Sequence, residues 1–242
     1  MFDQFPKTRP PLPEAIQAIY AAHYKVNREG ETAATSVAQR MERWLHRKVA
    51  ADVVGQTSQN VDQEIATLEV GAGTLNQFAY EPELGPYDII EPFTELIEGS
   101  ALLPRVRNTF ADISEIPSDT RYDRITAIAV FEHICNLPEV VAKAGLLLKP
   151  GGTLRVAIPS EGTILWTLGW KLTTGIEFRL KHGQDYGKLM RHEHVNTAQE
   201  IETVLRHFFE NVKCQTFGPC RALSFYQYFE CSNPILDRCC ER

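Results

Sequence analysis

The sequence lacks a long apolar run, an apolar leader and an excess of basic residues. No apolar segment approaches the roughly 20 residues of a membrane-spanning helix. Residues 1–6, Met-Phe-Asp-Gln-Phe-Pro, show no basic start followed by an apolar stretch. Lys and Arg number 25 against 31 Asp and Glu, so the net charge of −6 offers nucleic acid no basic stripe. We therefore expect a cytoplasmic protein that binds neither membranes nor nucleic acid.

Cysteine pairs at metal-binding spacing are also missing. None of the six cysteines belongs to a Cys-x-x-Cys pair, the spacing that a structural zinc site typically uses. Free thiols in a reducing compartment are expected instead. From the cysteines alone, the sequence predicts no metal centre.

What the sequence does contain is an apolar strand that runs into a glycine turn. Residues 67–73 read Thr-Leu-Glu-Val-Gly-Ala-Gly, and 22 residues after Glu69 a second acid, Glu91, closes the apolar run at 87–90. The glycines let a ligand approach the turn closely, and the Glu91 carboxylate can accept from two ribose hydroxyls. A strand, a turn, a helix and a second strand in this order predict a doubly wound α/β sheet that binds an adenosine-type cofactor.

The residue at position 76 separates two classes of cofactor. A dinucleotide fingerprint wants a third small residue there, where the helix N-terminus holds a pyrophosphate, whereas this chain has Asn76. S-adenosylmethionine carries adenine, ribose and a positive sulfonium but no phosphate, so it does not need that tight packing. The motif therefore favours S-adenosylmethionine over NAD.

Five segments, in order, resemble the class I S-adenosylmethionine-dependent methyltransferases, often called type 11 or type 12 methyltransferase domains. The segments are residues 68–73, 89–92, 110–113, 123–133 and 146–154. The resemblance implies a Rossmann-like, seven-stranded sheet, mostly parallel with an antiparallel last strand. It also implies S-adenosylmethionine as cofactor, with these residues in its site: Glu69, Gly71, Ala72, Gly73, Glu91, Pro92, Asp112, Ile113 and Phe131.

Three of these positions stand out on physical grounds as well. Glu69, Glu91 and Asp112 each close an apolar run, where an ordinary core strand would not place a charge. The resemblance implies that Asp112 contacts the adenine amino group and that the backbone carbonyl of Phe131 faces the methionine end of the cofactor.

The rest of the pattern divides the chain into an N-terminal helical cap, 1–60, and a methyltransferase domain, 61–242. Apolar spacing predicts helices within 13–54, with a break at 27–31. We expect this cap to act as a lid from which Tyr24 and Arg28 reach the cofactor carboxylate. The alternative is a solvated turn between two helices.

Alternating strands and helices follow, as in a parallel sheet. Thr197 and Glu200 predict a capping box at the start of a helix. The segment 159–196 is too long for an ordinary connection, and we interpret it as an insertion that walls the substrate pocket. The strands are predicted near residues 65–70, 87–90, 107–111, 123–130, 153–158, 211–217 and 224–231.

Three histidines are candidates for catalysis. A hydroxyl acceptor needs a base, and histidine is the usual choice near pH 7. His133 follows the fourth strand, while His192 and His194 flank Glu193 in the densest titratable cluster. The alternatives are structural: His133 caps a helix, and the other two satisfy backbone groups in a polar loop. The His-x-His spacing also permits metal ligation with Glu132 or Asp185.

The sequence thus predicts a methyltransferase that moves a methyl group to a small-molecule acceptor, an O or N atom of a sugar or secondary metabolite. The alternatives are an NAD-dependent oxidoreductase and a non-catalytic subunit that keeps the fold. A homodimer is compatible with this prediction.

Overall fold

The computed structural model describes residues 2–17, 19, 36–57 and 63–241, and its centre is a seven-stranded sheet. The strand order is β3-β2-β1-β4-β5-β7-β6, in which β7 runs antiparallel to both of its neighbours and the other pairs are parallel. This confirms the predicted Rossmann-like sheet with an antiparallel last strand. The strands are β1 (Thr67–Val70), β2 (Tyr87–Ile90), β3 (Asn108–Phe110), β4 (Tyr122–Ile128), β5 (Leu148–Pro159), β6 (Phe209–Phe217) and β7 (Tyr226–Pro234).

The helix expected directly after the glycine turn is absent, and that prediction was wrong. Residues 71–86 are all described, and the only helical element among them is a four-residue 3-10 helix, η2 (Asn76–Ala79). Leu75 stands before it with φ +64, a left-handed conformation that does not continue a helix. Pro82 and Pro86 follow within ten residues and keep a helix that starts at this turn from extending to β2.

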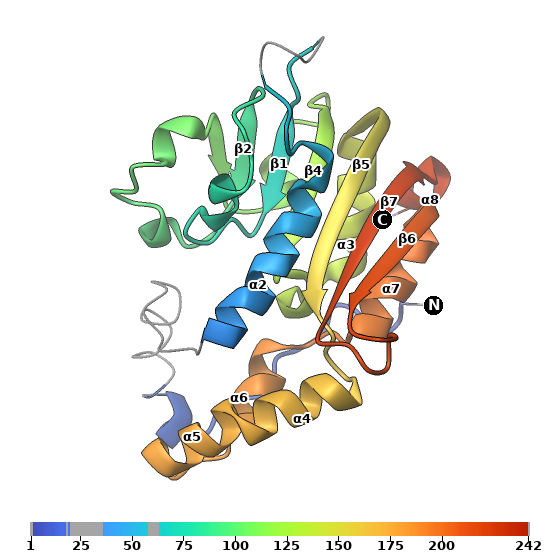
Figure 1. Cartoon of the computed structure of the whole chain (residues 1–242). Helices are drawn as coiled ribbons and strands as arrows, with labels where there is room; N and C mark the ends of the chain where they lie inside the picture. The colour runs from blue at the N-terminus through green and yellow to red at the C-terminus, as the bar shows by residue number, and fades with distance from the viewer. Residues whose placement is uncertain (1, 18, 20–35, 58–62, 242) are drawn as a thin grey trace.

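Helices cover both faces of the rest of the sheet (Figure 1). One face carries α3 (Leu137–Leu147) and α7 (Ala198–Phe208), which join the strands in the largest apolar cluster, and α8 (Leu236–Cys240) packs on both helices. The capping box predicted for α7 is present: Thr197 and Glu200 satisfy each other's backbone amides. Phe2 and Phe5 also lie in this cluster, so the Pro-rich N-terminus is anchored by buried rings.

The opposite face carries α2 (Ser36–Val49), which belongs to the predicted cap. Leu45 and Val49, one helical turn apart, pack against strand residues of β4, β5 and β7. The buried guanidinium groups of Arg124 and Arg155 donate to the backbone oxygen of Val49 at the end of the helix. Buried contacts therefore join the described end of the cap to the sheet.

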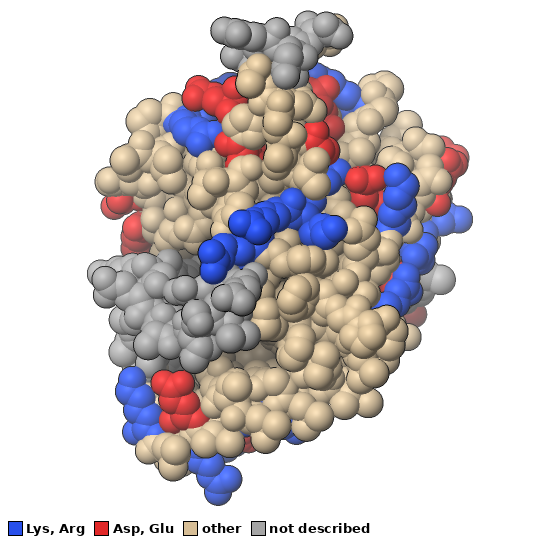
Figure 2. Space-filling view, viewed as in Figure 1, with Lys and Arg blue, Asp and Glu red and all other residues tan. Residues whose placement is uncertain are grey.

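Basic side chains form a band along α2 that the net charge of the chain did not predict (Figure 2). Arg43, Arg47 and Lys48 belong to this helix, and the two arginines are exposed. The band is local, because the surface below it in this view, over α4 (Ile164–Leu172), shows few charges.

The predicted insertion forms a layer beyond the carboxyl ends of the parallel strands (Figure 1). It consists of α4, α5 (Thr174–His182) and α6 (Tyr186–Glu193). Leu12 and Ile16 from the N-terminal segment pack between Phe178 and Leu189 of this layer. In doubly wound sheets ligands bind at this edge, so the layer lies where a substrate is expected.

Candidate functional site

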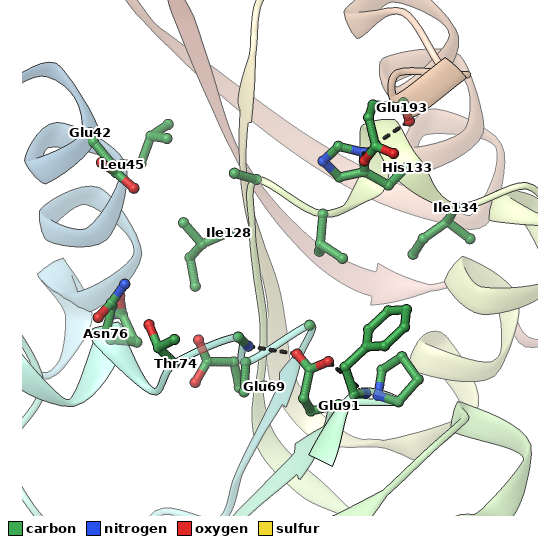
Figure 3. A pocket seen from close by; sticks show the side chains of 18 of the residues that line it. Glu42, Leu45, Glu69, Thr74, Asn76, Glu91, Ile128, His133, Ile134 and Glu193 are labelled. Carbon is green, nitrogen blue, oxygen red and sulfur yellow. Dashed lines mark hydrogen bonds and ion pairs between the residues drawn. The ribbon is translucent and has the colours of Figure 1, made fainter. Parts of the chain in front are cut away.

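A cavity of about 780 Å³ opens at the carboxyl edge of the sheet. Its volume lies within the range of small-molecule sites. Figure 3 shows the glycine turn and Glu91 on one side, His133 and Glu193 on the opposite side, and Glu42 and Leu45 on α2 beside them. Eight predicted site residues line it: Glu69, Gly71, Ala72, Gly73, Glu91, Pro92, His133 and His192.

The turn after β1 is built for close approach. Gly71 has φ +71, and a Cβ there would stand 2.4 Å from Cγ2 of Val130. Any larger residue would therefore collide with Val130, just after β4, and adopt a strained backbone. Gly73, at φ +54, donates its amide to Oε2 of Glu91 at 2.7 Å. The turn and the end of β2 are thereby held together across the base of the cavity.

Glu91 is buried, and two backbone amides hold its carboxylate: Gly73 N–H donates to one oxygen at 2.7 Å and Phe93 N–H donates to the other at 2.9 Å. An ionised carboxylate has about four acceptor positions. Each oxygen therefore keeps the capacity to accept a hydroxyl from a ligand in the cavity.

Glu69 is a buried acid with an unusual protonation state. Burial raises the pKa of its carboxyl group to about 8, and the nearby charge of Glu81 acts in the same direction. The Tyr87 hydroxyl donates to Oε2 of Glu69 at 2.9 Å and opposes this shift, as does the charge of Arg124. With this pKa the Glu69 carboxyl group is mostly protonated near neutral pH, although it lines the cavity.

Three predicted cofactor residues do not line the cavity. Asp112 is exposed and accepts from the amide and hydroxyl of Ser114, which holds the pKa of Asp112 below its ordinary value. Ile113 is buried beside it. Phe131 is fully buried, and its carbonyl oxygen accepts a hydrogen bond from the side-chain amide of Asn196 at 2.8 Å. Tyr24 and Arg28 lie outside the described residues.

The fold brings His133 and His194 together and places His192 at the same cavity as His133. His133 lies at the cavity wall, and its Nδ1 is 2.9 Å from the carbonyl oxygen of Glu193. His192 also lines the cavity, with Nδ1 2.7 Å from the carbonyl of Pro10. His194 lies behind His133, with its ring centroid 4.9 Å away.

His194 is paired with an acid that the sequence did not point to. Its Nδ1 lies 2.7 Å from Oε2 of Glu161, which also accepts from the indole of Trp166. Burial alone would lower the pKa of His194, but the bond to Glu161 and the charge of Glu132 outweigh it and raise that pKa. Burial alone would raise the pKa of the Glu161 carboxyl group, but the bond to and charge of His194, together with the hydrogen bonds from Trp166 and Gly162, lower it.

Sequence reasoning also missed two contributors to the cavity. Arg9 donates to the carbonyls of His133 and His192 and lies 3.6 Å from the Glu193 carboxylate. Glu42 reaches the cavity from α2. Both come from the region N-terminal to the family motifs, and no motif or spacing links either residue to the sheet.

The comparisons with known proteins agree with this architecture. A family model described as "Methyltransferase domain" matches residues 41–212. That range covers most of the chain, and the chain belongs to this methyltransferase family. The predicted class I fold is thereby confirmed, and no curated protein matches the sequence.

Three solved structures illustrate the likeness in fold. An O-methyltransferase family protein from Burkholderia thailandensis has a TM-score of 0.55 at 14% identity, over 94% of this chain and 65% of that one. The plantazolicin methyltransferase BpumL in complex with SAH has a TM-score of 0.54 at 14% identity, over 86% and 89%. N-methyltransferase NodS from Bradyrhizobium japonicum WM9 has a TM-score of 0.51 at 14% identity, over 84% and 99%.

Membrane insertion by a helix finds no support among the described residues. None of the helices there combines the length and the apolar character that a bilayer crossing requires.

Proposed function

We propose that this chain is an S-adenosylmethionine-dependent methyltransferase that acts on an oxygen or nitrogen atom of a small molecule, such as a sugar or secondary metabolite. The observation that carries the proposal is the Glu91 carboxylate, held at the cavity base by Gly73 N–H and Phe93 N–H. Membership of the methyltransferase family supports it.

The chain's own groups fit the cofactor. Glu91 would accept the two ribose hydroxyls, and the open turn from Gly71 to Gly73 would allow the ligand to lie over β1. Glu69, beside that turn, would face the ammonium of the methionine end. Asp112 and Ile113 follow β3, next to β2, and stay predictions for the adenine end.

When bound, the cofactor supplies an electrophilic methyl group, so the protein's part is mainly positioning. His133 and Glu193 stand across the cavity from Glu91, on the side left for the acceptor. An O-methyltransferase family protein and an N-methyltransferase are among the structural neighbours, which supports an oxygen or nitrogen atom as acceptor. The polar wall of Arg9, Glu42, His133 and Glu193 suits an acceptor that carries hydrogen-bonding groups.

A dinucleotide-dependent oxidoreductase fits the site poorly. Its pyrophosphate would need the N-terminus of a helix after the glycine turn. Within residues 71–86 the chain has only the four-residue η2. A non-catalytic subunit that keeps the fold is the other alternative, and turnover of an acceptor would exclude it.

Calorimetry with S-adenosylhomocysteine tests the proposal. We expect binding of one molecule per chain and no binding of NAD. Glu91→Ala should weaken binding by about 1.5–3 kcal/mol, the range for hydrogen bonds to a charged group. Glu95→Ala, at an exposed acid four residues on, is the matched control and should bind as the wild type does. If Glu91→Ala binds S-adenosylhomocysteine as tightly as Glu95→Ala and the wild type do, Glu91 does not belong to the site.

A further inference from the structure

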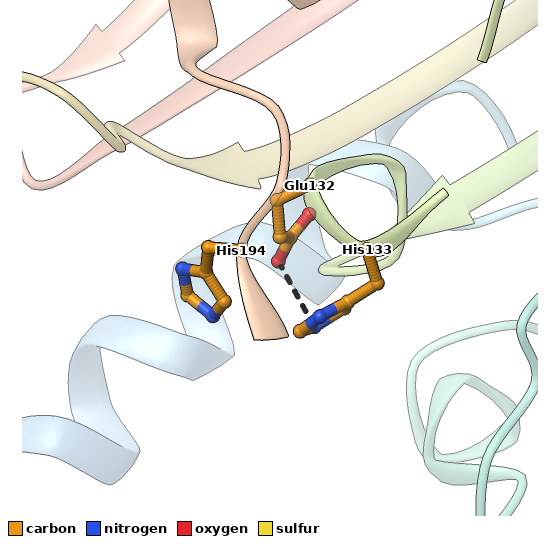
Figure 4. A group of neighbouring side chains, drawn as sticks. All are labelled: Glu132, His133 and His194. Atoms are coloured by element: carbon orange, nitrogen blue, oxygen red, sulfur yellow. Dashed lines mark ion pairs between the residues drawn. The ribbon is translucent and has the colours of Figure 1, made fainter. Parts of the chain in front are cut away.

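A carboxylate and two imidazoles lie close together where His133 lines the cavity (Figure 4). Glu132 and His133 lie in the 3-10 helix η6 (Phe131–His133) after β4, and His194 follows the end of α6. One potential ligand atom from each residue lies within 4.8 Å of the others. Oε1 of Glu132 and Nε2 of His133 are 3.8 Å apart.

Both rings are held by their Nδ1 atoms. Nδ1 of His133 lies 2.9 Å from the Glu193 carbonyl, which can only accept, so this nitrogen carries the proton of the neutral ring. Nδ1 of His194 lies 2.7 Å from the Glu161 carboxylate. In the neutral rings Nε2 is then the atom with the lone pair. Metal-bound histidines are commonly oriented in this way, by an oxygen acceptor on the other ring nitrogen.

Glu132 supplies an independent sign of a missing partner. Its residue is 1% exposed, and Oε2 has no hydrogen-bond partner among the described residues. Burying a carboxylate oxygen without a partner is costly. The backbone around it is firmly held, because the amides of Val195 and Asn196 both donate to the Glu132 carbonyl. The two segments that carry the three side chains are thus fixed to each other.

We propose that Glu132, His133 and His194 bind a divalent transition-metal ion. Two imidazole nitrogens and one carboxylate oxygen suit Zn²⁺, Co²⁺ or Fe²⁺, whereas Mg²⁺ and Ca²⁺ prefer sites made of oxygen alone. The carboxylates of Glu161 and Glu193 behind the two rings add negative charge that a divalent ion would offset. This reverses the expectation of no metal, which followed from cysteine spacing.

Binding requires the three side chains to close on the ion. Ligand atoms of a tetrahedral site lie about 3.4 Å apart, because each stands about 2.0–2.1 Å from the metal. The present separations of up to 4.8 Å must therefore shorten. His133 also lines the cavity, so the ion would lie at its wall. Its remaining positions would be left for water or, if the proposed function holds, for an oxygen of the acceptor.

Titration of the EDTA-dialysed full chain with Co²⁺ tests the site without cofactor or acceptor. We expect visible ligand-field bands that saturate at one ion per chain, and release of the Co²⁺ when Zn²⁺ is added. A strong near-ultraviolet thiolate band should be absent, which separates this site from the free cysteines. A spectrum dominated by thiolate, or no saturable binding, would overturn the proposal.

Variants locate the ion. His194→Ala and the isosteric Glu132→Gln should each weaken Co²⁺ binding at least tenfold, while circular dichroism reports whether the fold persists. His192→Ala is the matched control, because His192 lies two residues away and lines the same cavity. It should bind Co²⁺ as the wild type does. Co²⁺ binding as tight as in the wild type in His194→Ala and Glu132→Gln, or binding weakened equally in all three variants, would contradict the assignment. Loss of S-adenosylhomocysteine binding in Glu91→Ala with Co²⁺ binding intact would keep the two sites distinct.

Discussion

Cofactor affinity should rise with pH because Glu69 must lose a proton to face a cation. The pKa of this carboxyl group is about 8 in the ligand-free protein, chiefly because it is buried. The ammonium of S-adenosylhomocysteine would favour the ionised form, so binding releases a proton wherever Glu69 is still protonated. The proposed contact therefore links affinity to pH below 8.

The magnitude follows from the fraction of protein that carries the carboxylate. For a pKa of about 8, the apparent Kd rises over its limiting value by a factor of about 100 at pH 6 and about 2 at pH 8. The expected gain in affinity between the two pH values is therefore about fiftyfold, or about 2.3 kcal/mol. This is an upper limit, reached if the bound carboxylate stays ionised at pH 6.

Calorimetry in buffers with different heats of ionisation measures both quantities. We expect the affinity to rise across this range and about 0.9 proton to be released per ligand at pH 7. Glu69→Gln, which cannot ionise, should bind with little dependence on pH and release no proton. An affinity that changes less than twofold in the wild type, with no proton release, would refute the proposed role of Glu69.

Three further outcomes follow from the same structure. Glu69→Gln should stabilise the protein increasingly from pH 5 to pH 9, by at most about 5 kcal/mol, in urea unfolding at each pH. The pKa of Glu69 is about 8 in the folded protein against 4.5 when unfolded, so the wild type loses stability as the pH rises between these values. A difference in unfolding free energy between variant and wild type that stays constant with pH would contradict this. Gly71→Ala should abolish detectable S-adenosylhomocysteine binding, whereas Gly99→Ala, where the described chain leaves the added Cβ clear, should not; equal binding would disprove the steric role. Alanine variants of His133, His192 and His194 test the catalytic base. If one of these histidines contacts the acceptor, its alanine variant should lower kcat about a hundredfold with cofactor affinity unchanged. Unchanged kcat in all three variants would make these side chains structural.

The sheet could be predicted because its signals are local. An apolar run, a glycine turn and a closing acid lie within a few residues of each other, and β1 and β2 lie at the positions that this pattern predicts. The prediction of a helix between them was wrong because it followed the glycine motif alone and did not take into account that the prolines at 82 and 86 limit the length of a helix. The left-handed conformation of Leu75 carries no sequence signal, since glycine or asparagine is the usual residue there.

Most of the predicted residues that line the cavity lie at or after a strand end, and His192, which was predicted from the titratable cluster, is the exception. Glu69, Glu91 and His133 each stand at or just after a strand end, and all three line the cavity. His194 joins His133 across about sixty residues through the packing of α6, and no spacing rule connects them. Glu161 was missed for the same reason, because its role depends on the direction of the His194 ring.

A crystal structure with S-adenosylhomocysteine bound would test most directly whether Glu91 binds the ribose of the cofactor. We expect the ribose hydroxyls within hydrogen-bonding distance of both Glu91 oxygens, the ammonium beside Glu69, and the sulfur turned towards the side of His133. Ligand bound elsewhere, or bound in the cavity with its ribose away from Glu91, would contradict it.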